Sequence, residues 1–505
     1  MVKNSGSKKF ILQLDCCFGD MSKYSPKELI EWMMYNIDKC GCKVDTILWE
    51  THRFMPMECP SNNTPTYEKF AERNIDIMRI IIEECHRRGI KCIMHCRASE
   101  VNVSAKKGLP GKQGWNKTKL EHPDWVIKTW YQEGHWNYAC KEFREFKINY
   151  ISKMMSQYDF DGFCIDFSRH LPVLPVGKQW ELRGELTQFM RDLKQALKRE
   201  DKEISVGAKV PENQMVCRDD GFDIETWIEE ELTDFFVIGS RSIYVEVEWY
   251  KSLLKGKNIK LYPCWDSWHS GDAQHCVTKE FYRGLILNWF AKGADGVVGF
   301  NFIPAPQEVT FQMFEPRVFP GQPTDWLYRY PDYEEMYQSF LEVEDLSLNH
   351  KYAVDRRGGY PYLTGNFTNN TYAQLPMDIP NDGTKANVTI EVYERAQKDK
   401  VRLTFVIFNA KENIDKFKVY LNGEETEVFS VDFHYIDRQI FSPHPQPNSG
   451  RGYCVTSNPS ELLRIDADFP TELLKFGDNV MSISVVDRTD YILDNIVIER
   501  AEILL

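Results

Sequence analysis

The sequence of 505 residues contains no apolar run near the ~20 residues that a membrane-spanning helix requires. Its first residues, MVKNSGSKK, contain no signal-peptide core before the first candidate strand. No basic helix or basic stripe of the kind that binds nucleic acid is present, and the net charge is -13. We therefore expect a cytoplasmic protein with neither a membrane nor a nucleic-acid partner. A leader that was removed is the alternative.

Signatures of nucleotide and zinc sites are missing as well. The first candidate strand is followed by CCFGD at 16–20 rather than by a glycine-rich phosphate turn, so nucleotide binding has little support. Cys40 and Cys42 are close in sequence, as are Cys92 and Cys96, yet neither pair has the second half of a zinc site. Most of the 14 cysteines read as reduced, buried thiols, which agrees with a cytoplasmic location.

Eight short apolar runs, rich in β-branched and aromatic residues, alternate with segments of helical periodicity. The candidate strands are 10–15, 44–49, 90–95, 162–167, 204–210, 235–239, 259–264 and 296–301. The candidate helices are 27–38, 67–88, 141–155, 185–198, 224–232 and 279–292. Strands that alternate with helices pair in parallel, so eight such units predict an α/β fold, a (β/α)8 TIM barrel over residues 1–350. An open doubly wound sheet is the structural alternative.

The alternation stops after residue 350, where short strands with alternating polarity begin. The clearest are 389–393, 401–408, 417–421, 480–486 and 492–500, and Asn422-Gly423 predicts a hairpin turn. This pattern predicts a C-terminal β-sandwich over residues 351–505. We expect this domain to brace the barrel or to form a subunit contact, because no aromatic platform can be identified from the sequence. Glycan binding is the alternative.

Five of the eight candidate strands are followed directly by a cation: Arg53, Arg97, Arg169, Lys209 and Arg241. The carboxyl ends of barrel strands are where such folds carry their function. Cations clustered there in an acidic protein indicate an anionic ligand, because Arg can hold a carboxylate through two parallel hydrogen bonds. The alternative is that each cation orients a neighbouring carboxylate. We expect Arg97, Arg169 and Arg241 to hold the anion, with Arg53 and Lys209 as ion-pair partners.

The same strand ends carry acidic and amide groups that suit hydrolysis of a glycosidic bond, which needs one group to protonate the leaving oxygen and another to activate water or attack the anomeric carbon. These groups are Asp15, Glu50, Asp166, Glu212, Asp266 and Asn301. His52, His95 and His170 could converge with Asp15 or Asp166 around a metal, but their spacing does not encode that convergence. We expect no metal and no other cofactor.

The third strand-to-helix connection, 97–138, is unusually long, and long connections are commonly functional. It is rich in aromatic residues suited to stacking on sugar rings. It also contains His135, which lies just before the helix that starts near Lys141. A His can act as a base near neutral pH, although a loop His is more commonly an ordinary polar residue. The residues alone therefore do not make His135 catalytic.

The segments HPDWVI and FDGFCIDFSRH, together with the barrel and sandwich layout, resemble the glycoside-hydrolase-10-like barrel proteins. Within that group, nearly the whole chain most closely resembles the glycoside hydrolase family 156 exo-sialidases (neuraminidases). The resemblance implies a homodimeric hydrolase that inverts anomeric configuration, with catalytic Asp15 and His135. It implies a sialylated glycan or glycoconjugate as the substrate, and the cations would then hold the sialic acid carboxylate.

The resulting hypothesis is a single displacement in which His135 takes a proton from water and Asp15 protonates the leaving oxygen, or the reverse. Two other functions stay open. One is a glycosidase for neutral or uronic-acid glycans that uses Asp166 with Glu50, Glu212 or Asp266. The other is a non-catalytic carbohydrate-binding barrel. A propeller sialidase is not expected, because Ser-x-Asp-x-Gly repeats are absent from the sequence.

Overall fold

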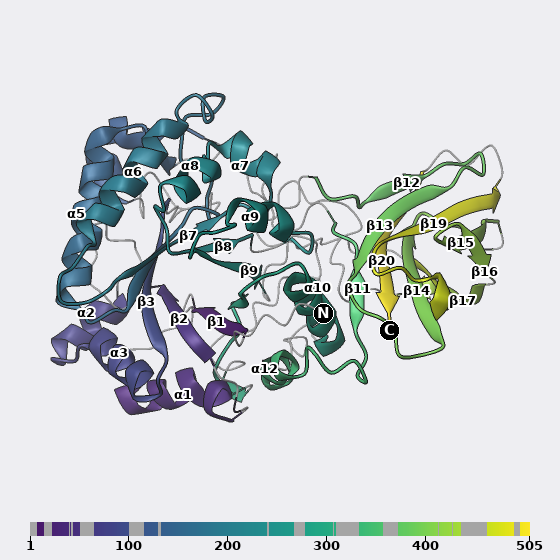
Figure 1. The fold of residues 1–505 in the computed structure, drawn as a ribbon, viewed down its shortest axis with the longest axis horizontal. Coiled ribbons are helices and arrows are strands. Elements are labelled where there is room, and N and C mark those ends of the chain that lie inside the picture. Colours follow the sequence, from purple (N-terminus) through teal and green to yellow (C-terminus); the bar gives the residue numbers. More distant parts are fainter. Residues whose placement is uncertain are drawn as a thin grey trace.

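Eight parallel strands close into a barrel in the order β1-β10-β9-β8-β7-β6-β3-β2 (Figure 1). The computed structural model describes residues 8–14, 23–39, 41, 44–50, 65–99, 116–129, 133–239, 242–266, 278–306, 308–309, 333–356, 372–412, 414–426, 428–435, 462–488 and 495–505. The barrel strands are β1 (Lys9–Leu14), β2 (Val44–Glu50), β3 (Lys91–Arg97), β6 (Gly162–Asp166), β7 (Ser205–Val210), β8 (Phe235–Ile238), β9 (Lys260–Asp266) and β10 (Gly296–Phe300). Each coincides with a predicted run, so the (β/α)8 prediction is confirmed and the open sheet is wrong.

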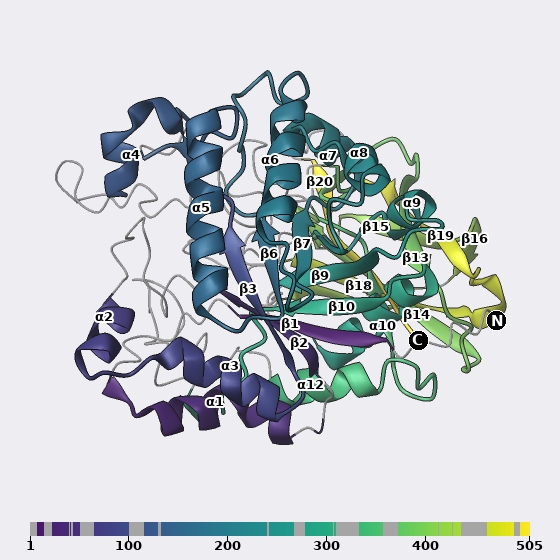
Figure 2. The ribbon, with the colours of Figure 1, turned by 60° about the vertical axis from the view of Figure 1, so that its left-hand side comes forward.

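Helices form an outer layer around this barrel (Figure 2). They are α1 (Pro26–Lys39), α2 (Pro65–Glu72), α3 (Ile77–Arg87), α5 (Lys141–Gln157), α6 (Arg183–Ala196), α7 (Gln214–Asp220), α8 (Ile224–Glu229), α9 (Val247–Leu253), α10 (Lys279–Ala291) and α12 (Tyr333–Leu341), with the short α4 (Lys117–Glu121) in the third connection. The single helix predicted over 67–88 is two helices, because Asn74 has a φ of 58° and the Asp76 side chain caps α3. Within the described residues, no helix is long and apolar enough to cross a membrane.

The lumen of the barrel is packed rather than open. Alternate residues of each strand point inward, and most of them are apolar. The apolar lumen residues are Ile11, Leu48, Ile93, Cys164, Phe235, Val237, Tyr262, Cys264, Val298 and Phe300. A second, larger apolar cluster fills the space between the strands and the helices. The lumen core supports the residues that follow it at the carboxyl ends of the strands.

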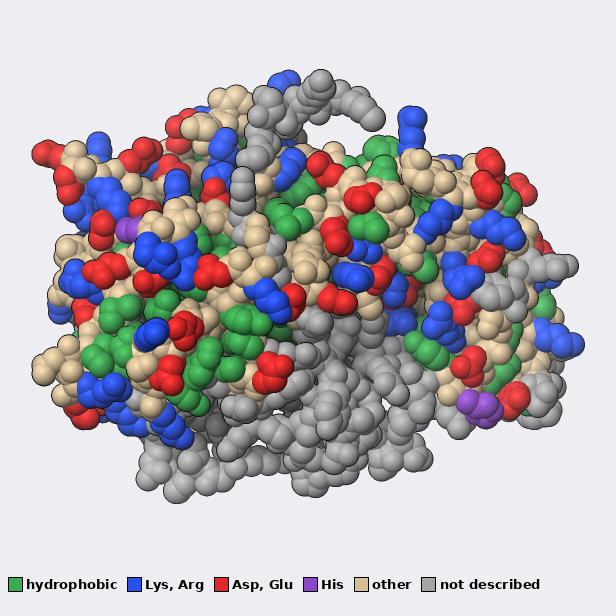
Figure 3. Space-filling view, turned by 90° about the horizontal axis from the view of Figure 1, so that it is seen from below, with side chains coloured by type: hydrophobic (Ala, Val, Ile, Leu, Met, Phe, Trp, Pro, Cys, Tyr) green, Lys and Arg blue, Asp and Glu red, His purple; other side chains and the backbone are tan. Residues whose placement is uncertain are grey.

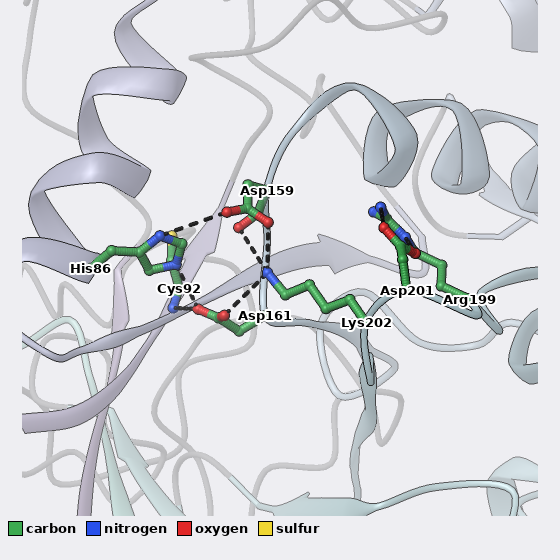
Figure 4. A network of polar contacts seen from close by, with 7 residues as sticks. All are labelled: His86, Cys92, Asp159, Asp161, Arg199, Asp201 and Lys202. Atoms are coloured by element: carbon green, nitrogen blue, oxygen red, sulfur yellow. Dashed lines mark hydrogen bonds and ion pairs between the residues drawn. The ribbon is translucent and has the colours of Figure 1, made fainter.

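The amino ends of three strands are held by a polar network that Figure 4 shows. His86 Nε2 lies 2.9 Å from Asp161 Oδ2, and Lys202 Nζ lies 2.7 Å from Asp159 and 3.3 Å from Asp161. Asp161 also accepts a hydrogen bond from the backbone N of Cys92, at 2.8 Å. These contacts join β3, β6 and β7 at the end of the barrel that usually serves stability.

The C-terminal part is a β-sandwich, as predicted. Its first sheet contains β11 (Lys351–Ala353), β20 (Ile496–Leu504), β14 (Lys400–Phe408), β18 (Leu462–Pro470) and β17 (Val428–Tyr435), with β12 (Met377–Ile379) paired to β20. Its second sheet contains β13 (Ala386–Val392), β19 (Gly477–Asp487), β15 (Lys416–Leu421) and β16 (Glu424–Thr426). A separate apolar cluster lies between the sheets. Asn422 and Gly423, with φ values of 52° and 97°, form the predicted turn.

The sandwich packs directly on α10 of the barrel layer (Figure 1). A Cβ atom on Gly284 would lie 2.3 Å from the backbone oxygen of Lys351, so β11 approaches the helix backbone at this glycine. Lys292 Nζ lies 2.5 Å from the carboxylate of Glu391 in β13, and Asn288 donates to the backbone oxygen of Glu391 at 2.8 Å. The division at residue 350 stays a prediction, because β11 contacts both parts of the chain.

Charges on the exterior are mixed. Among the described residues on the face that Figure 3 shows, Lys and Arg side chains are interspersed with Asp and Glu side chains. Such mixing gives this face no field of a single sign. Charges of one sign gather instead in two less exposed places, with cations at the carboxyl ends of the barrel strands and carboxylates in a cleft beside the sandwich.

Candidate active site

Five buried polar side chains lie above the apolar lumen core, on five neighbouring strands of the barrel. They are Gln13, Glu50, His95, Asp166 and Lys209, none more than 1% exposed, and we call them the strand-end network. Each continues the inward-facing series of its own strand, for example Ile11 then Gln13, and Ile93 then His95. Buried charges are tolerated only when they are paired, so the contacts among these groups decide what they can do.

His95 joins the two carboxylates of the network. Its Nδ1 lies 3.1 Å from Glu50 Oε2, and its Nε2 lies 3.4 Å from Asp166 Oδ2. Burial alone would lower the pKa of His95, but the hydrogen bonds to Asp166 and Glu50 outweigh burial and raise the pKa to about 9. Burial would raise the pKa of Asp166, but Lys209 and His95 hold it well below its usual range. The network therefore contains an imidazolium and an ionised Asp166 at neutral pH.

Lys209 and the two arginines complete the pairing. Lys209 Nζ donates to Gln13 Oε1 at 2.7 Å, lies 3.8 Å from Asp166 Oδ2, and sits 4.4 Å from the ring centroid of Phe300. Arg97 Nε lies 3.3 Å from Glu50 Oε2. The backbone N of Arg169 donates to Asp166 Oδ1 at 3.1 Å. Lys209 is therefore an ion-pair partner inside the barrel, whereas Arg97 and Arg169 lie at the rim.

The raised pKa of His95 predicts how stability depends on pH. A group whose pKa is raised by folding stabilises the folded state below its unfolded pKa, here 6.5, and that contribution is lost as the pH rises through about 9. We expect the melting temperature to decrease as the pH is raised from 6.5 to about 9. Thermal unfolding followed by circular dichroism at a series of pH values measures this. A melting temperature that stays constant or rises across the interval would contradict the charged His95.

His135 is held over the rim by a two-stranded sheet that the sequence did not predict. Strand β4 (Val126–Ile127) pairs with β5 (His135–Trp136), and the backbone N of Trp136 donates to Ser99 Oγ at 3.1 Å, just after β3. His135 is fully buried, and its Nδ1 lies 2.8 Å from Thr129 Oγ1. Burial, and secondarily the charge of Lys119, lower the pKa of His135 to about 3. The ring is therefore fixed and neutral.

His170 shares this environment. It follows β6 with a φ of 61°, and its pKa lies well below the usual value because of burial and then the charges of Arg169 and Arg97. His135 and Lys119 also act on it. Arg169 Nη1 is buried, and no described residue accepts a hydrogen bond from it. Two neutral histidines thus lie in a positive field set by Arg97, Arg169 and Lys119, which we call the rim cations.

Apart from His135, the predicted site residues divide into four groups. Glu50, Arg97, Asp166, Arg169 and Lys209 lie together, joined by the contacts given above. Asp266 lies nearby at the end of β9, where Asn301 donates to its Oδ1 at 2.8 Å. Glu212 is buried beyond β7, in a cleft beside the sandwich. Asp15, Arg53 and Arg241 lie outside the described residues, as does His52.

Three residues of the site were not identified from the sequence. Gln13 could have been, because it is the polar member of the inward series in β1. The other two are Lys119 and Glu133. Lys119 donates to the backbone oxygen of Gly134 at 2.9 Å and lies 3.5 Å from Glu133 Oε1, so Lys119 and Glu133 hold the turn before His135. Nothing in their spacing signals this, because the long connection folds back on itself. In the described part of the chain, no cluster of three or more potential ligands forms a metal site.

Comparisons with known proteins give only remote similarities. No family model matches the chain. No curated protein matches it either. Among solved structures, it is similar to a cycloisomaltooligosaccharide glucanotransferase from Paenibacillus sp. (11% identity, TM-score 0.33, 98% of this chain and 57% of that one). It is also similar to a β-galactosidase from Marinomonas ef1 (11% identity, TM-score 0.41, 67% and 59%).

A third solved structure is a maltogenic α-amylase from Thermotoga neapolitana (11% identity, TM-score 0.35, 95% and 99%). This chain thus spans less than two thirds of the length of the first two structures, 57% and 59%. At 11% identity and TM-scores of 0.33 to 0.41, these similarities do not establish an activity for this chain. What the chain does must be argued from its own strand-end residues.

Proposed function

We propose that this protein is an exo-sialidase, a glycoside hydrolase that releases a terminal sialic acid from a glycan or glycoconjugate. The observation that carries the proposal is the positive rim, where the Nη1 atom of Arg169 is buried without a described acceptor. A carboxylate bound there would receive charge-assisted hydrogen bonds from a guanidinium that already lies in place. Sialic acid presents such a carboxylate on its anomeric carbon, next to the bond that breaks.

The charge balance of the site supports an anionic ligand. Among the described residues joined in this region, Glu50 and Asp166 face His95, Lys209 and the two rim arginines. Among these described groups positive charge exceeds negative charge, also when Asp266 at the end of β9 is counted. Burial is the main cause of the depressed pKa values of His135 and His170, and the neighbouring cations lower them further, because a positive field disfavours the protonated imidazole. Binding a carboxylate would relieve this excess.

The same field suggests how His135 could work. Burial makes His135 a neutral but weak base, with a pKa of about 3. A bound substrate carboxylate would offset the field of Lys119, the smaller of the two causes, and so raise the basicity of His135 in part. Its Nδ1 faces Thr129, which orients the other ring nitrogen for proton transfer with water. Asp15 would then protonate the leaving oxygen in a single inverting displacement, or the two roles would be exchanged.

A glycosidase that acts through Asp166 is the second candidate, because Asp166 is an ionised carboxylate at the end of the lumen. Glu50 and Asp166 bind opposite nitrogens of one imidazole, which makes them ion-pair partners of His95 rather than an acid and base around a substrate. Glu212 lies in the cleft beside the sandwich. Asp266 is therefore the partner that this candidate would use.

A panel of fluorogenic glycosides separates the candidates. We expect 4-methylumbelliferyl sialic acid to be cleaved, and neutral and uronic-acid glycosides to be left intact. Nuclear magnetic resonance of the first sugar released should show the opposite anomer to that of the substrate. Cleavage of the neutral or uronic-acid glycosides alone would replace the proposal with the second candidate. We also propose a homodimer, which light scattering measures.

The Arg169 guanidinium provides a more specific test. Because Lys keeps the charge but loses the planar fork, we expect Arg169→Lys to raise KM for a sialoside roughly a hundredfold, with a smaller effect on kcat. Arg169→Met should weaken binding further. Arg191→Met is the matched control, since Arg191 is paired with Glu230 at 2.6 Å on the outer helix α6. An unchanged KM in both Arg169 variants would remove Arg169 from the anion site.

A further inference from the structure

A cleft of about 620 Å³ runs between the barrel and the sandwich. Its barrel wall is formed by the segments after β7 and β8, by α9 and by the end of α10, and its sandwich wall by β13, the chain before it and the start of β19. The volume is typical of a site for a small organic ligand. Neither the strand-end network nor a rim cation lines it, so the cleft is a separate feature of the molecule.

Aromatic side chains form part of both walls. Tyr244 on the barrel side and Tyr372 on the sandwich side line the cleft, and each is 49% exposed. Tyr393 lies beside them, and Lys292 is placed 5.1 Å from the Tyr244 ring centroid and 5.5 Å from that of Tyr393. Half-exposed rings with apolar faces and polar edges are suited to contact with a ligand that has both kinds of surface.

Two of these three rings are held in position by their hydroxyl groups. The Tyr372 hydroxyl donates to Asp219 Oδ2 at 2.7 Å, and the Tyr393 hydroxyl donates to Glu248 Oε1 at 3.2 Å. Because the hydroxyls are tied to neighbouring carboxylates, ring orientation is settled before a ligand arrives. A preorganised surface loses less entropy on binding than a mobile one.

The charge of the cleft is opposite to that of the barrel rim. Its described lining contains no Lys, Arg or His but includes six carboxylates: Glu212, Glu246, Glu248, Asp355, Glu391 and Asp478. The nearest cation, Lys292, is buried behind this lining and is paired with Glu391. Burial, followed by the field of Glu391 and its acidic neighbours, raises the pKa of Tyr244 to about 12. An anionic ligand would be repelled here, so the cleft does not take the same group as the rim.

At least four of these six carboxylates have donors within the protein, Glu248 through the Tyr393 hydroxyl and three others as follows, which argues against a cationic ligand. Glu391 is paired with Lys292, Asp355 accepts the backbone N–H groups of Ile243 and Tyr244, and Glu246 accepts that of Gln214. A site that waited for a cation would present carboxylates without such partners. What remains is a set of hydrogen-bond acceptors around fixed aromatic faces, which matches the hydroxyls and C–H faces of an uncharged sugar.

We propose that this cleft binds a neutral oligosaccharide, with pyranose rings on the faces of Tyr244 and Tyr372 and sugar hydroxyls donating to the surrounding carboxylates and amides. The proposal does not depend on which bond the barrel hydrolyses. For a sialylated glycan, the two sites would divide the ligand by charge, the rim taking the acidic terminal sugar and the cleft taking neutral sugars.

Titration calorimetry of the full chain with lactose and N-acetyllactosamine tests the proposal, with free sialic acid as the anionic probe. We expect both neutral disaccharides to bind, and Tyr244→Ala or Tyr372→Ala to weaken binding about tenfold each. Tyr372→Phe should retain most of the affinity, because the ring stays. Leu341→Ala is the control, since Leu341 is 55% exposed on α12, away from the cleft.

The proposal is overturned if neither neutral disaccharide binds, or if both tyrosine-to-alanine variants bind as the parent does. Preferential binding of free sialic acid that the cleft variants abolish would also overturn it. Hydrolysis of a small fluorogenic sialoside, measured on the same variants, should stay unchanged. This keeps the two ideas apart, because a chain that binds lactose without cleaving the sialoside would contradict only the proposed function.

Discussion

Replacement of His135 by Ala is expected to lower kcat for a sialoside about a thousandfold, the size of effect that a positioned acid or base provides. The imidazole is fully buried at the barrel rim, with one nitrogen bound to Thr129, so no water could take over its role in the same geometry. Steady-state kinetics with 4-methylumbelliferyl sialic acid measures the loss. Asp15→Ala, the partner in the proposed displacement, should have an effect of similar size.

A matched control exists in the same connection. His122 stacks on Trp125 with ring centroids 3.9 Å apart and is partly exposed, so His122→Ala should leave kcat nearly unchanged. If activity survived both His135→Ala and Asp15→Ala, the sialidase assignment of the site would be wrong. Activity lost instead in Asp266→Asn would favour the second candidate, the glycosidase that pairs Asp166 with Asp266.

Asp166→Asn is expected to lower the free energy of unfolding by about 3–5 kcal/mol, because it leaves the buried charges of His95 and Lys209 without their shared partner. Asp166 Oδ2 lies 3.4 Å from His95 Nε2 and 3.8 Å from Lys209 Nζ. The same change should reduce kcat strongly, since the strand-end network supports the rim. Urea denaturation followed by tryptophan fluorescence measures the stability change.

A second substitution separates the pairing from the loss of one carboxylate. Adding Lys209→Met to Asp166→Asn removes an unpaired buried cation and should restore part of the lost stability. Asp159→Asn is the control at the opposite end of the barrel, where the carboxylate is 69% exposed, and it should change stability by less than about 1 kcal/mol. Equal stability of Asp166→Asn and the parent would mean that the network is not charged as described.

The strands were predictable because their inward and outward faces are both apolar over short stretches bounded by turns. Helix α7 was missed although Asn213 caps its start and Gly221, with a φ of 83°, ends it. Those two signals were readable, but seven residues are too few to show a helical period. The β4–β5 pair was not readable, because two residues per strand carry no pattern.

The sequence predicted which charged residues lie at the strand ends, but not which of them form ion pairs with one another. Period and turn signals place Glu50, Asp166 and Lys209 at strand ends, yet which of them share a partner depends on the stagger of strands around the barrel, which local sequence does not encode. The prediction for the aromatic side chains shows the same limit. No aromatic platform was identifiable, because Tyr244 and Tyr372 come from different parts of the chain and line the same cleft only in the folded protein.

The contact at Gly284 has a consequence for how this protein can be divided. Since a Cβ there would lie 2.3 Å from the Lys351 backbone, the helix and the first sandwich strand fit only while residue 284 stays a glycine and both segments are present. A chain that ended at residue 350 would expose the face of α10 that β11 covers. A sandwich joined to another protein would lose the helix on which it packs. We therefore expect barrel and sandwich to be inherited together, as a single evolutionary unit rather than as exchangeable modules.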